Sequence, residues 1–230
     1  MILQDDFIEN CGLLLEGHGE RVGCMARYLM GLVTQNATLP SDLHITAAGR
    51  CHDVGKIFIP DAILEAPRRL TEEEQKVMAL HPVLGHYALQ GIAKKYGWLI
   101  SQDIYDGILL HHECWDGSGY PFGLKGDAIP LCARILSVVD IIDAVLSPRS
   151  YKPAYPISSV RAIIARLSGT VLDPTLAAIA VNNLPQIIRK GRMAGHTENF
   201  PLLFQKHASL KPSASPLIDA PVFSIDQNLK

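Results

Sequence analysis

Apolar residues recur every three to four positions along most of the chain, which is the spacing of α-helices buried on one face. Between positions 7 and 32 this pattern is interrupted by glycines, which suggests a break just before His18. The same pattern predicts helices over residues 42–51, 60–64, 83–96, 101–112, 130–147, 156–167 and 174–189. Strand-like alternation of useful length is absent. The sequence therefore predicts an all-α fold.

Local signals mark several boundaries of these helices. Thr71 followed by Glu74 forms a capping box at the start of a further helix, and Gly55 is interpreted as a left-handed cap that ends the helix before it. Beyond Gly191 the periodicity stops and prolines recur. We expect one helical domain over residues 1–190 and an irregular C-terminal tail over 191–230, which either drapes over the domain or is partly disordered.

Composition narrows the class of protein. The 230 residues are 48% hydrophobic, enough for a sizeable core, and 21 Lys and Arg nearly balance 23 Asp and Glu. This balance argues against a long nucleic-acid partner. Five cysteines without a CxxC pair disfavour a disulfide framework and favour a reducing compartment. Without a signal peptide or a long apolar run, we expect a cytoplasmic protein that neither enters nor spans a membrane.

Candidate chemistry gathers at residues 111–121, HHECWDGSGYP, where adjacent histidines precede acids and a glycine-rich turn. His52 and Asp53 form a second adjacent pair at a helix end, His18 and His81 stand near helix starts, and Asp140 lies inside an apolar helix. Imidazole and carboxylate ligands without sulfur suit iron, manganese, zinc or nickel. Together these residues supply enough ligands for two metal ions.

A single histidine, aspartate or cysteine can also have a purely structural role. We interpret His44, His86, His196 and His207 as structural histidines. Asp140 alone would also suit the role of capping a buried backbone group. Cys51 and Cys114 are interpreted as packing residues. The joint pattern of paired ligands on different helices carries the metal hypothesis.

These motifs resemble the HD superfamily of metal phosphohydrolases, through HDVGK at 52–56, and its HD-GYP subfamily, through HHECWDGSGYP at 111–121. The connecting segments are also similar, namely IPDAIL at 59–64, LTEEE at 70–74, HPVLG at 81–85 and GLKGDAIPLCARILSVVDIIDA at 123–144. The resemblance covers about residues 10–190. It implies an HD-type helical bundle that hydrolyses the bacterial second messenger cyclic di-GMP to pGpG, to GMP or to both.

The resemblance also implies roles for single residues. The metal ligands would be His18, His52, Asp53, His81, His111, His112 and Asp140. Asp53 would bridge two divalent ions, with iron or manganese favoured over zinc or nickel, and the ions would activate a bridging water for attack on phosphorus. Lys56 would contact the scissile phosphate. Tyr120, Arg149 and Lys152 would bind the nucleotide. Glu113 and Asp116 are predicted to orient metal-binding imidazoles.

One position departs from part of the family. Some members carry a glutamate that helps to hold a third ion, and Leu14 stands there in this chain, while Glu16 falls on the wrong helical face. We therefore expect two ions.

Alternative functions and partners remain open. The rival functions are an idle module that senses cyclic di-GMP or docks onto a protein, and a phosphohydrolase acting on another nucleotide. A diguanylate cyclase, another regulatory partner and a second copy of the chain remain open as partners.

Overall fold

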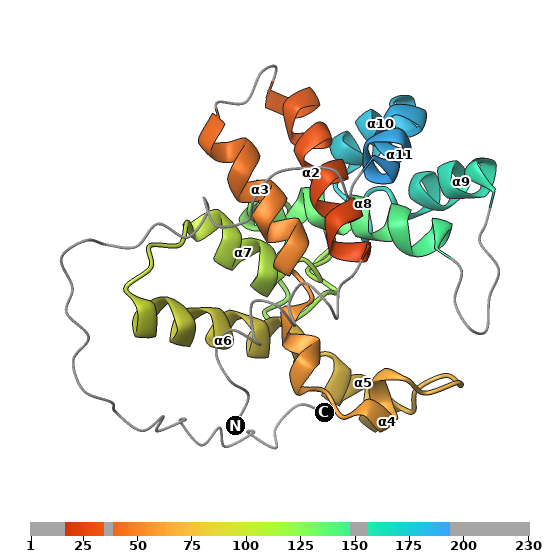
Figure 1. The fold of residues 1–230 in the computed structure, drawn as a ribbon. Helices are drawn as coiled ribbons and strands as arrows, with labels where there is room; N and C mark the ends of the chain where they lie inside the picture. Colours follow the sequence, from red (N-terminus) through yellow and green to blue (C-terminus); the bar gives the residue numbers. More distant parts are fainter. Residues whose placement is uncertain (1–16, 35–38, 148–155, 194–230) are drawn as a thin grey trace.

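The computed structural model describes residues 17–34, 39–147 and 156–193, and within these ranges it is helical without a strand. This confirms the all-α prediction. The first helices, labelled as in Figure 1, are α2 (His18–Thr34), α3 (Leu39–Cys51), α4 (Asp61–Leu64), α5 (Glu72–Met78) and α6 (His81–Tyr96). They are followed by α7 (Gln102–Leu110), α8 (Leu131–Leu146), α9 (Ile157–Leu167), α10 (Pro174–Asn182) and α11 (Leu184–Arg192). Two short 3₁₀ helices, η1 (Val54–Phe58) and η2 (Gly126–Ala128), connect them.

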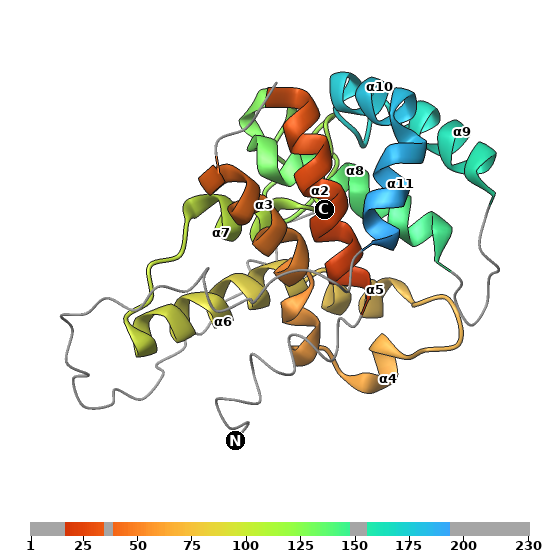
Figure 2. The ribbon, with the colours of Figure 1, turned by 45° about the horizontal axis from the view of Figure 1, so that its top comes forward.

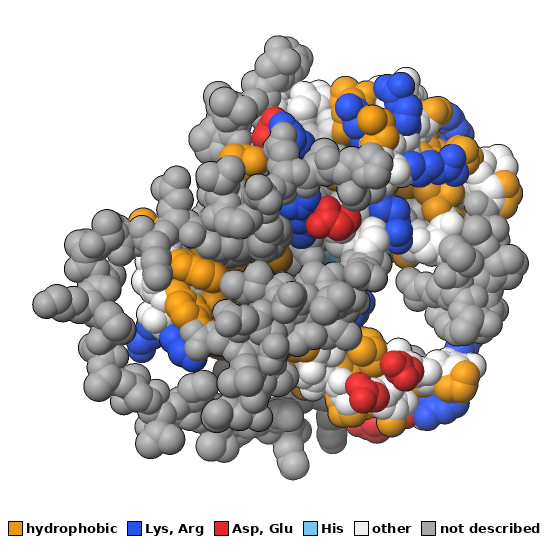
Figure 3. All heavy atoms as spheres, in the orientation of Figure 1, with side chains coloured by type: hydrophobic (Ala, Val, Ile, Leu, Met, Phe, Trp, Pro, Cys, Tyr) orange, Lys and Arg blue, Asp and Glu red, His pale blue; other side chains and the backbone are white. Residues whose placement is uncertain are grey.

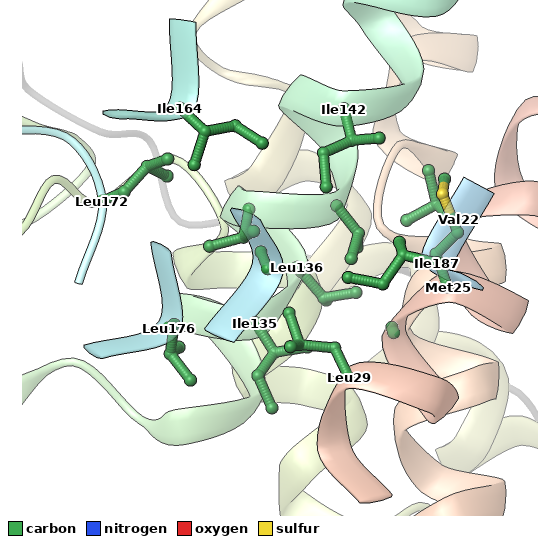
Figure 4. Close-up of a cluster of buried hydrophobic side chains, with 14 of the residues drawn as sticks. Val22, Met25, Leu29, Ile135, Leu136, Ile142, Ile164, Leu172, Leu176 and Ile187 are labelled. Atoms are coloured by element: carbon green, nitrogen blue, oxygen red, sulfur yellow. The ribbon is translucent and has the colours of Figure 1, made fainter. Parts of the chain in front are cut away.

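Helix α8 runs through the middle of the fold and is buried on most of its surface, as its nearly uninterrupted apolar sequence requires. It packs against α2, α7, α9 and α10, whereas α11 packs against α2 and α10. Figure 4 shows the side chains that fill this core, which include Met25 and Leu29 of α2, Leu136 and Ile142 of α8, and Ile187 of α11. Because α8 carries Asp140, this core fixes the position of one candidate ligand.

A second buried cluster joins α3, α6 and α7 and is built from Ala47, Cys51, Leu89, Ile104 and Ile108. Cys51 is buried there, in agreement with its interpretation as a packing residue. The cluster holds the C-terminal ends of α3 and α7 beside the N-terminal end of α6 (Figure 1). These three helix ends carry five of the candidate ligands.

Gly55 has a different role from the predicted one. Helix α3 already ends at Cys51, and Gly55 lies within η1 without a positive φ angle, so the cap prediction was wrong. A Cβ atom at this position would overlap the carbonyl oxygen of His81 and lie 2.5 Å from the backbone nitrogen of Gly85. The absence of a side chain therefore lets η1 approach the first turn of α6 closely.

Other boundaries follow local chemistry. The capping box of α5 is confirmed, because Thr71 Oγ1 accepts a hydrogen bond from the Glu74 amide and the Glu74 carboxylate accepts one from the Thr71 amide. The prediction of one continuous helix over 174–189 was wrong, because the helix is interrupted at Asn183, between α10 and α11. Pro185 explains the break, because a proline suits the first turn of a new helix but not a helix interior.

The predicted boundary at residue 190 stays a prediction. The last described helix ends at Arg192, and residues 194–230 lie outside the described ranges. No helix among the described residues is long and apolar enough to cross a bilayer. On the face drawn in Figure 3, basic side chains are interspersed with acidic and apolar ones.

Candidate metal centre

The ends of several helices bring the candidate ligands to one place beside α8 (Figures 1 and 2). His18 begins α2, His52 and Asp53 follow α3, His81 begins α6, His111 and His112 follow α7, and Asp140 lies within α8. The rings of the five histidines form a contiguous series, with centroids of neighbouring rings 4.1 to 5.3 Å apart. All seven predicted ligands therefore lie in one cluster.

The first group of ligand atoms comes from Asp53, His81, His111 and His112, which each place one such atom within 4.8 Å of the others. Nε2 of His81 lies 3.1 Å and Nε2 of His111 lies 3.9 Å from Asp53 Oδ1. The two imidazole nitrogens are 3.3 Å apart. Three imidazoles and one carboxylate oxygen thus face a common point.

The second group comes from His18, His52 and Asp53, again within 4.8 Å of one another. Nε2 of His52 lies 3.4 Å and Nε2 of His18 lies 3.7 Å from Asp53 Oδ2. Asp140 Oδ1 joins this group, 3.2 Å from Nε2 of His18 and 3.8 Å from Nε2 of His52. Two imidazoles and two carboxylates surround this second point.

Asp53 belongs to both groups through different atoms. Its Oδ1 faces His81 and His111, whereas its Oδ2 faces His18 and His52. The residue is buried at the centre of the cluster. A carboxylate in this position is placed to share its two oxygens between two cations.

Backbone carbonyls orient three of the imidazoles. Nδ1 of His52 donates to Gly49 O at 2.8 Å, Nδ1 of His81 to Met78 O at 2.8 Å, and Nδ1 of His111 to Ile108 O at 2.9 Å. Since a carbonyl oxygen only accepts hydrogen bonds, the proton of each neutral ring lies on Nδ1. The lone pair of Nε2 then points into the cluster, as a metal ligand requires.

The two groups differ in their charge. Burial opposes protonation of His18, but the hydrogen bonds that its ring donates to Asp140 and Asp143 raise its pKa to about 9. Although burial alone would raise it, the pKa of Asp53 is held well below its ordinary value by His52 and by the hydrogen bonds it accepts. Burial lowers the pKa of His112 to about 4 and that of His111 well below its ordinary value, with the neighbouring imidazoles adding to the effect.

These pKa shifts set the protonation of the histidines in the cluster. The carboxylates hold a proton on His18, where a cation would otherwise balance their charge. His111 and His112 are neutral at pH 7 and offer lone pairs for coordination.

Lys56 and Tyr120 lie at the edge of the cluster. Nζ of Lys56 is 2.5 Å from Asp53 Oδ2, so its ammonium group pairs with the shared carboxylate. The ring of Tyr120 stacks on His112 with a centroid distance of 4.8 Å and an interplanar angle of 26°. Both side chains therefore contact a candidate ligand directly.

Glu113 and Asp116 do not orient imidazoles, contrary to the prediction. The buried Glu113 carboxylate accepts hydrogen bonds from the amides of Phe122 at 2.7 Å and Leu124 at 2.9 Å, and Asp116 accepts one from the Ser118 amide at 2.9 Å. Both acids stabilise the 111–124 loop, Glu113 from its interior and Asp116 at its exposed surface.

Sequence reasoning missed Asp143 and Arg21. Asp143 Oδ2 lies 2.7 Å from Nδ1 of His18, and Arg21 Nε donates to Asp143 Oδ1 at 2.6 Å. The signal available in the sequence was their spacing, because Asp143 follows Asp140 by three residues and Arg21 follows His18 by three. Residues three apart on a helix lie on the same side.

Six residues discussed from the sequence lie outside the described residues, including His196 and His207, which were interpreted as structural histidines. The other four are Arg149 and Lys152, predicted to bind the nucleotide, and Leu14 and Glu16, which bear on a third ion.

The residues present fit divalent metal ions of the first transition series. The donors are imidazole nitrogens and carboxylate oxygens, which such ions prefer over the exclusively oxygen shells of calcium. Nε2 of His52 is buried and makes no hydrogen bond. Its lone pair is therefore available to coordinate a metal ion. A cation would satisfy it and balance the buried carboxylates.

Comparison with protein families gives a match to the HD domain family over residues 5–176. Among curated proteins, the chain is 42% identical to the cyclic di-GMP phosphodiesterase response regulator RpfG of Xanthomonas campestris pv. campestris, covering 64% of this chain and 38% of that protein. It is 34% identical to the 3'3'-cGAMP-specific phosphodiesterase 2 of Vibrio cholerae, covering 70% of this chain and 29% of that protein. The chain thus spans about a third of the length of these relatives.

Among solved structures, an HDG"Y"P protein from Bdellovibrio bacteriovorus superposes with a TM-score of 0.58 over 74% of this chain and 51% of that one. The sequence identity of this pair is 16%, so the likeness concerns the fold.

Proposed function

Because the chain belongs to the HD domain family, we propose that it is a metal-dependent phosphodiesterase that hydrolyses cyclic di-GMP. The observation that carries this proposal is the placement of Asp53, whose two oxygens face two separate groups of imidazoles. The likeness to RpfG supports the substrate, since that relative is named a cyclic di-GMP phosphodiesterase.

Each group of ligands would hold one divalent ion. One ion would be held by His81, His111, His112 and Asp53 Oδ1, and the other by His18, His52, Asp140 and Asp53 Oδ2. Such ions, with iron or manganese favoured over zinc or nickel, lower the pKa of a bound water and stabilise negative charge on phosphoryl oxygens.

The remaining residues would position the substrate. Lys56 carries its ammonium group to the shared carboxylate, within reach of a phosphate bound there, and acts as a point charge toward phosphoryl oxygen. Tyr120 is held beside the cluster by its stacking on His112 and would contact the nucleotide. Arg149 and Lys152 remain proposed phosphate contacts on the basis of the family resemblance.

A second candidate substrate is 3'3'-cGAMP, because a relative that is 34% identical is named a phosphodiesterase specific for it. The two dinucleotides share the phosphodiester chemistry and differ in one base. Turnover rates measured on both compounds, with pGpG and GMP separated among the products, decide the preference and the end point.

The test uses protein loaded anaerobically with iron(II) or manganese(II) and supplied with cyclic di-GMP. Wild type should release pGpG or GMP, and Asp53→Ala should lose metal and turnover together. Asp61→Ala, which removes an exposed carboxylate on α4, is the matched control and should behave as wild type. Full turnover by Asp53→Ala would overturn the proposal. Binding of cyclic di-GMP without turnover by wild type with every metal would instead support the sensing module.

A further inference from the structure

The imidazoles of the cluster differ in the hydrogen-bond partner of their Nδ1 atoms. His52, His81 and His111 donate through Nδ1 to backbone carbonyls, whereas Nδ1 of His18 lies 2.7 Å from the carboxylate of Asp143. Asp143 is 3% exposed. We propose that Asp143 is a positioning residue that orients His18 and strengthens it as a ligand, and that Arg21 holds Asp143 in place for this purpose. The inference rests on the proposed two-ion site.

Arg21 engages both oxygens of the Asp143 carboxylate. Its Nε donates to Oδ1 at 2.6 Å and its Nη2 donates to Oδ2 at 2.9 Å. Ser147, the residue that follows α8, donates to Oδ2 at 3.3 Å. A carboxylate held by this fork has little freedom to rotate away from His18.

The arrangement links two helices through matched spacings. His18 and Arg21 lie three residues apart on α2, and Asp140 and Asp143 lie three residues apart on α8. Asp143 contacts Nδ1 of His18, while Asp140 Oδ1 lies 3.2 Å from Nε2 of the same ring. The two acids of α8 therefore address opposite sides of one imidazole, and only Asp140 is a candidate ligand.

A carboxylate acts differently from a carbonyl as the partner of a metal-binding imidazole. Both fix the proton on Nδ1, but the carboxylate carries a full negative charge and makes the ring a stronger electron donor at Nε2. His18 belongs to the group with His52 and Asp53 Oδ2. Loss of Asp143 should therefore weaken the ion in that group and spare the ion held by His81, His111 and His112.

A purely structural role for Asp143 makes a different prediction. If the pair of Arg21 and Asp143 served only to hold α2 against α8, its loss would destabilise the fold and affect both ions alike. Asp173 offers a matched control, because it is a carboxylate that is 6% exposed and accepts a 2.9 Å hydrogen bond from Arg134, without contact to a candidate ligand.

The test titrates the metal-free protein with manganese(II) and measures the number of bound ions and the affinity of each. Wild type should bind two ions, and Asp143→Asn should keep one affinity and lose about 10- to 100-fold in the other. An anomalous-scattering map of the variant should show the retained ion beside His81. Asp173→Asn should keep both affinities.

Three results would overturn the inference. Unchanged binding of both ions by Asp143→Asn, or an equal loss of both, would reduce Asp143 to a structural residue. A single ion in wild type would overturn the two-ion site and the inference together. If Asp143→Asn fails to fold, Arg21→Gln keeps the carboxylate but removes its fork, and it should weaken the same ion selectively; equal affinities at both positions in that variant would contradict the inference.

Discussion

Replacing Glu113 by glutamine should loosen the substrate loop and leave the metal ions in place. The Glu113 side chain is 2% exposed and accepts hydrogen bonds from the amides of Phe122 and Leu124, one on each carboxylate oxygen. Glutamine has the same shape but presents an NH₂ group in place of one oxygen. That group would face a backbone N–H, so one hydrogen bond is lost and the other becomes neutral.

The expected loss of stability follows from the change in these two hydrogen bonds. A hydrogen bond to a charged group contributes about 1.5–3 kcal/mol and a neutral one about 1 kcal/mol. Losing one bond and weakening the other is partly offset by the smaller desolvation cost of a buried amide, which leaves a net loss of about 2–3 kcal/mol. For a chain of this size, about 2–4 °C per kcal/mol corresponds to a Tm lowered by about 4–12 °C.

The assay combines thermal unfolding, metal analysis and steady-state kinetics on the metal-loaded protein. Glu113→Gln should lower Tm and raise KM more than it lowers kcat, with wild-type metal content. Asp116→Asn is the control, because its carboxylate bonds the Ser118 amide at the exposed loop surface, and such changes alter stability by about 0.5 kcal/mol or less. A Glu113→Gln protein with wild-type Tm and reduced metal content would refute the reasoning and restore an imidazole-orienting role for Glu113.

Three further perturbations probe other parts of the site. Gly55→Ala forces a methyl group into the backbone of α6 at His81 and should lower the free energy of unfolding by about 3 kcal/mol or more, measured by urea denaturation; an unchanged midpoint would contradict the close packing. Because His18 in the metal-free protein has a pKa of about 9, it is protonated at neutral pH and must release its proton to bind an ion. The affinity of the ion at His18 should therefore rise by at least about tenfold per pH unit between pH 6 and 8, since the pKa of His52 in the same group is, despite its burial, also raised by Asp53. A pH-independent affinity in calorimetric titrations would speak against His18 as a ligand. Tyr120→Phe keeps the stacking on His112 and should preserve KM, whereas Tyr120→Ala should raise KM by about 2- to 12-fold, and equal KM values for both variants would exclude an aromatic contribution.

The helical architecture was predictable because its signals are local. Periodic apolar residues and the capping box at Thr71 and Glu74 depend on neighbours within one or two turns, and the structure has the helices that they predict. The break at Asn183 was missed although Pro185 marks it, since the apolar pattern runs through both α10 and α11.

Residue roles that depend on tertiary contacts were harder to predict from the sequence. The neighbouring sequence of Gly55 predicts a helix cap. Only the contact between η1 and α6 shows that the position must lack a side chain. Glu113 stands beside two histidines in the sequence, yet its carboxylate turns to amides 9 and 11 residues away. Asp143 contacts a residue 125 positions earlier. Its three-residue spacing from Asp140 places it on the same side of a helix, but that spacing does not identify His18 as its partner.

The metal ligands, too, were predictable as residues but not in their arrangement. Motif resemblance identified the ligand residues, but it did not show that each oxygen of Asp53 faces a different group. That division follows from the positions of α3, α6 and α7 around the second buried cluster.

The most direct test of the two-ion account is an anomalous-scattering map of manganese-loaded crystals with cyclic di-GMP bound. The account predicts two peaks, one on each side of the Asp53 carboxylate, with a phosphate of the nucleotide between the ions and Lys56. A single peak, or two peaks of which only one contacts Asp53, would contradict it.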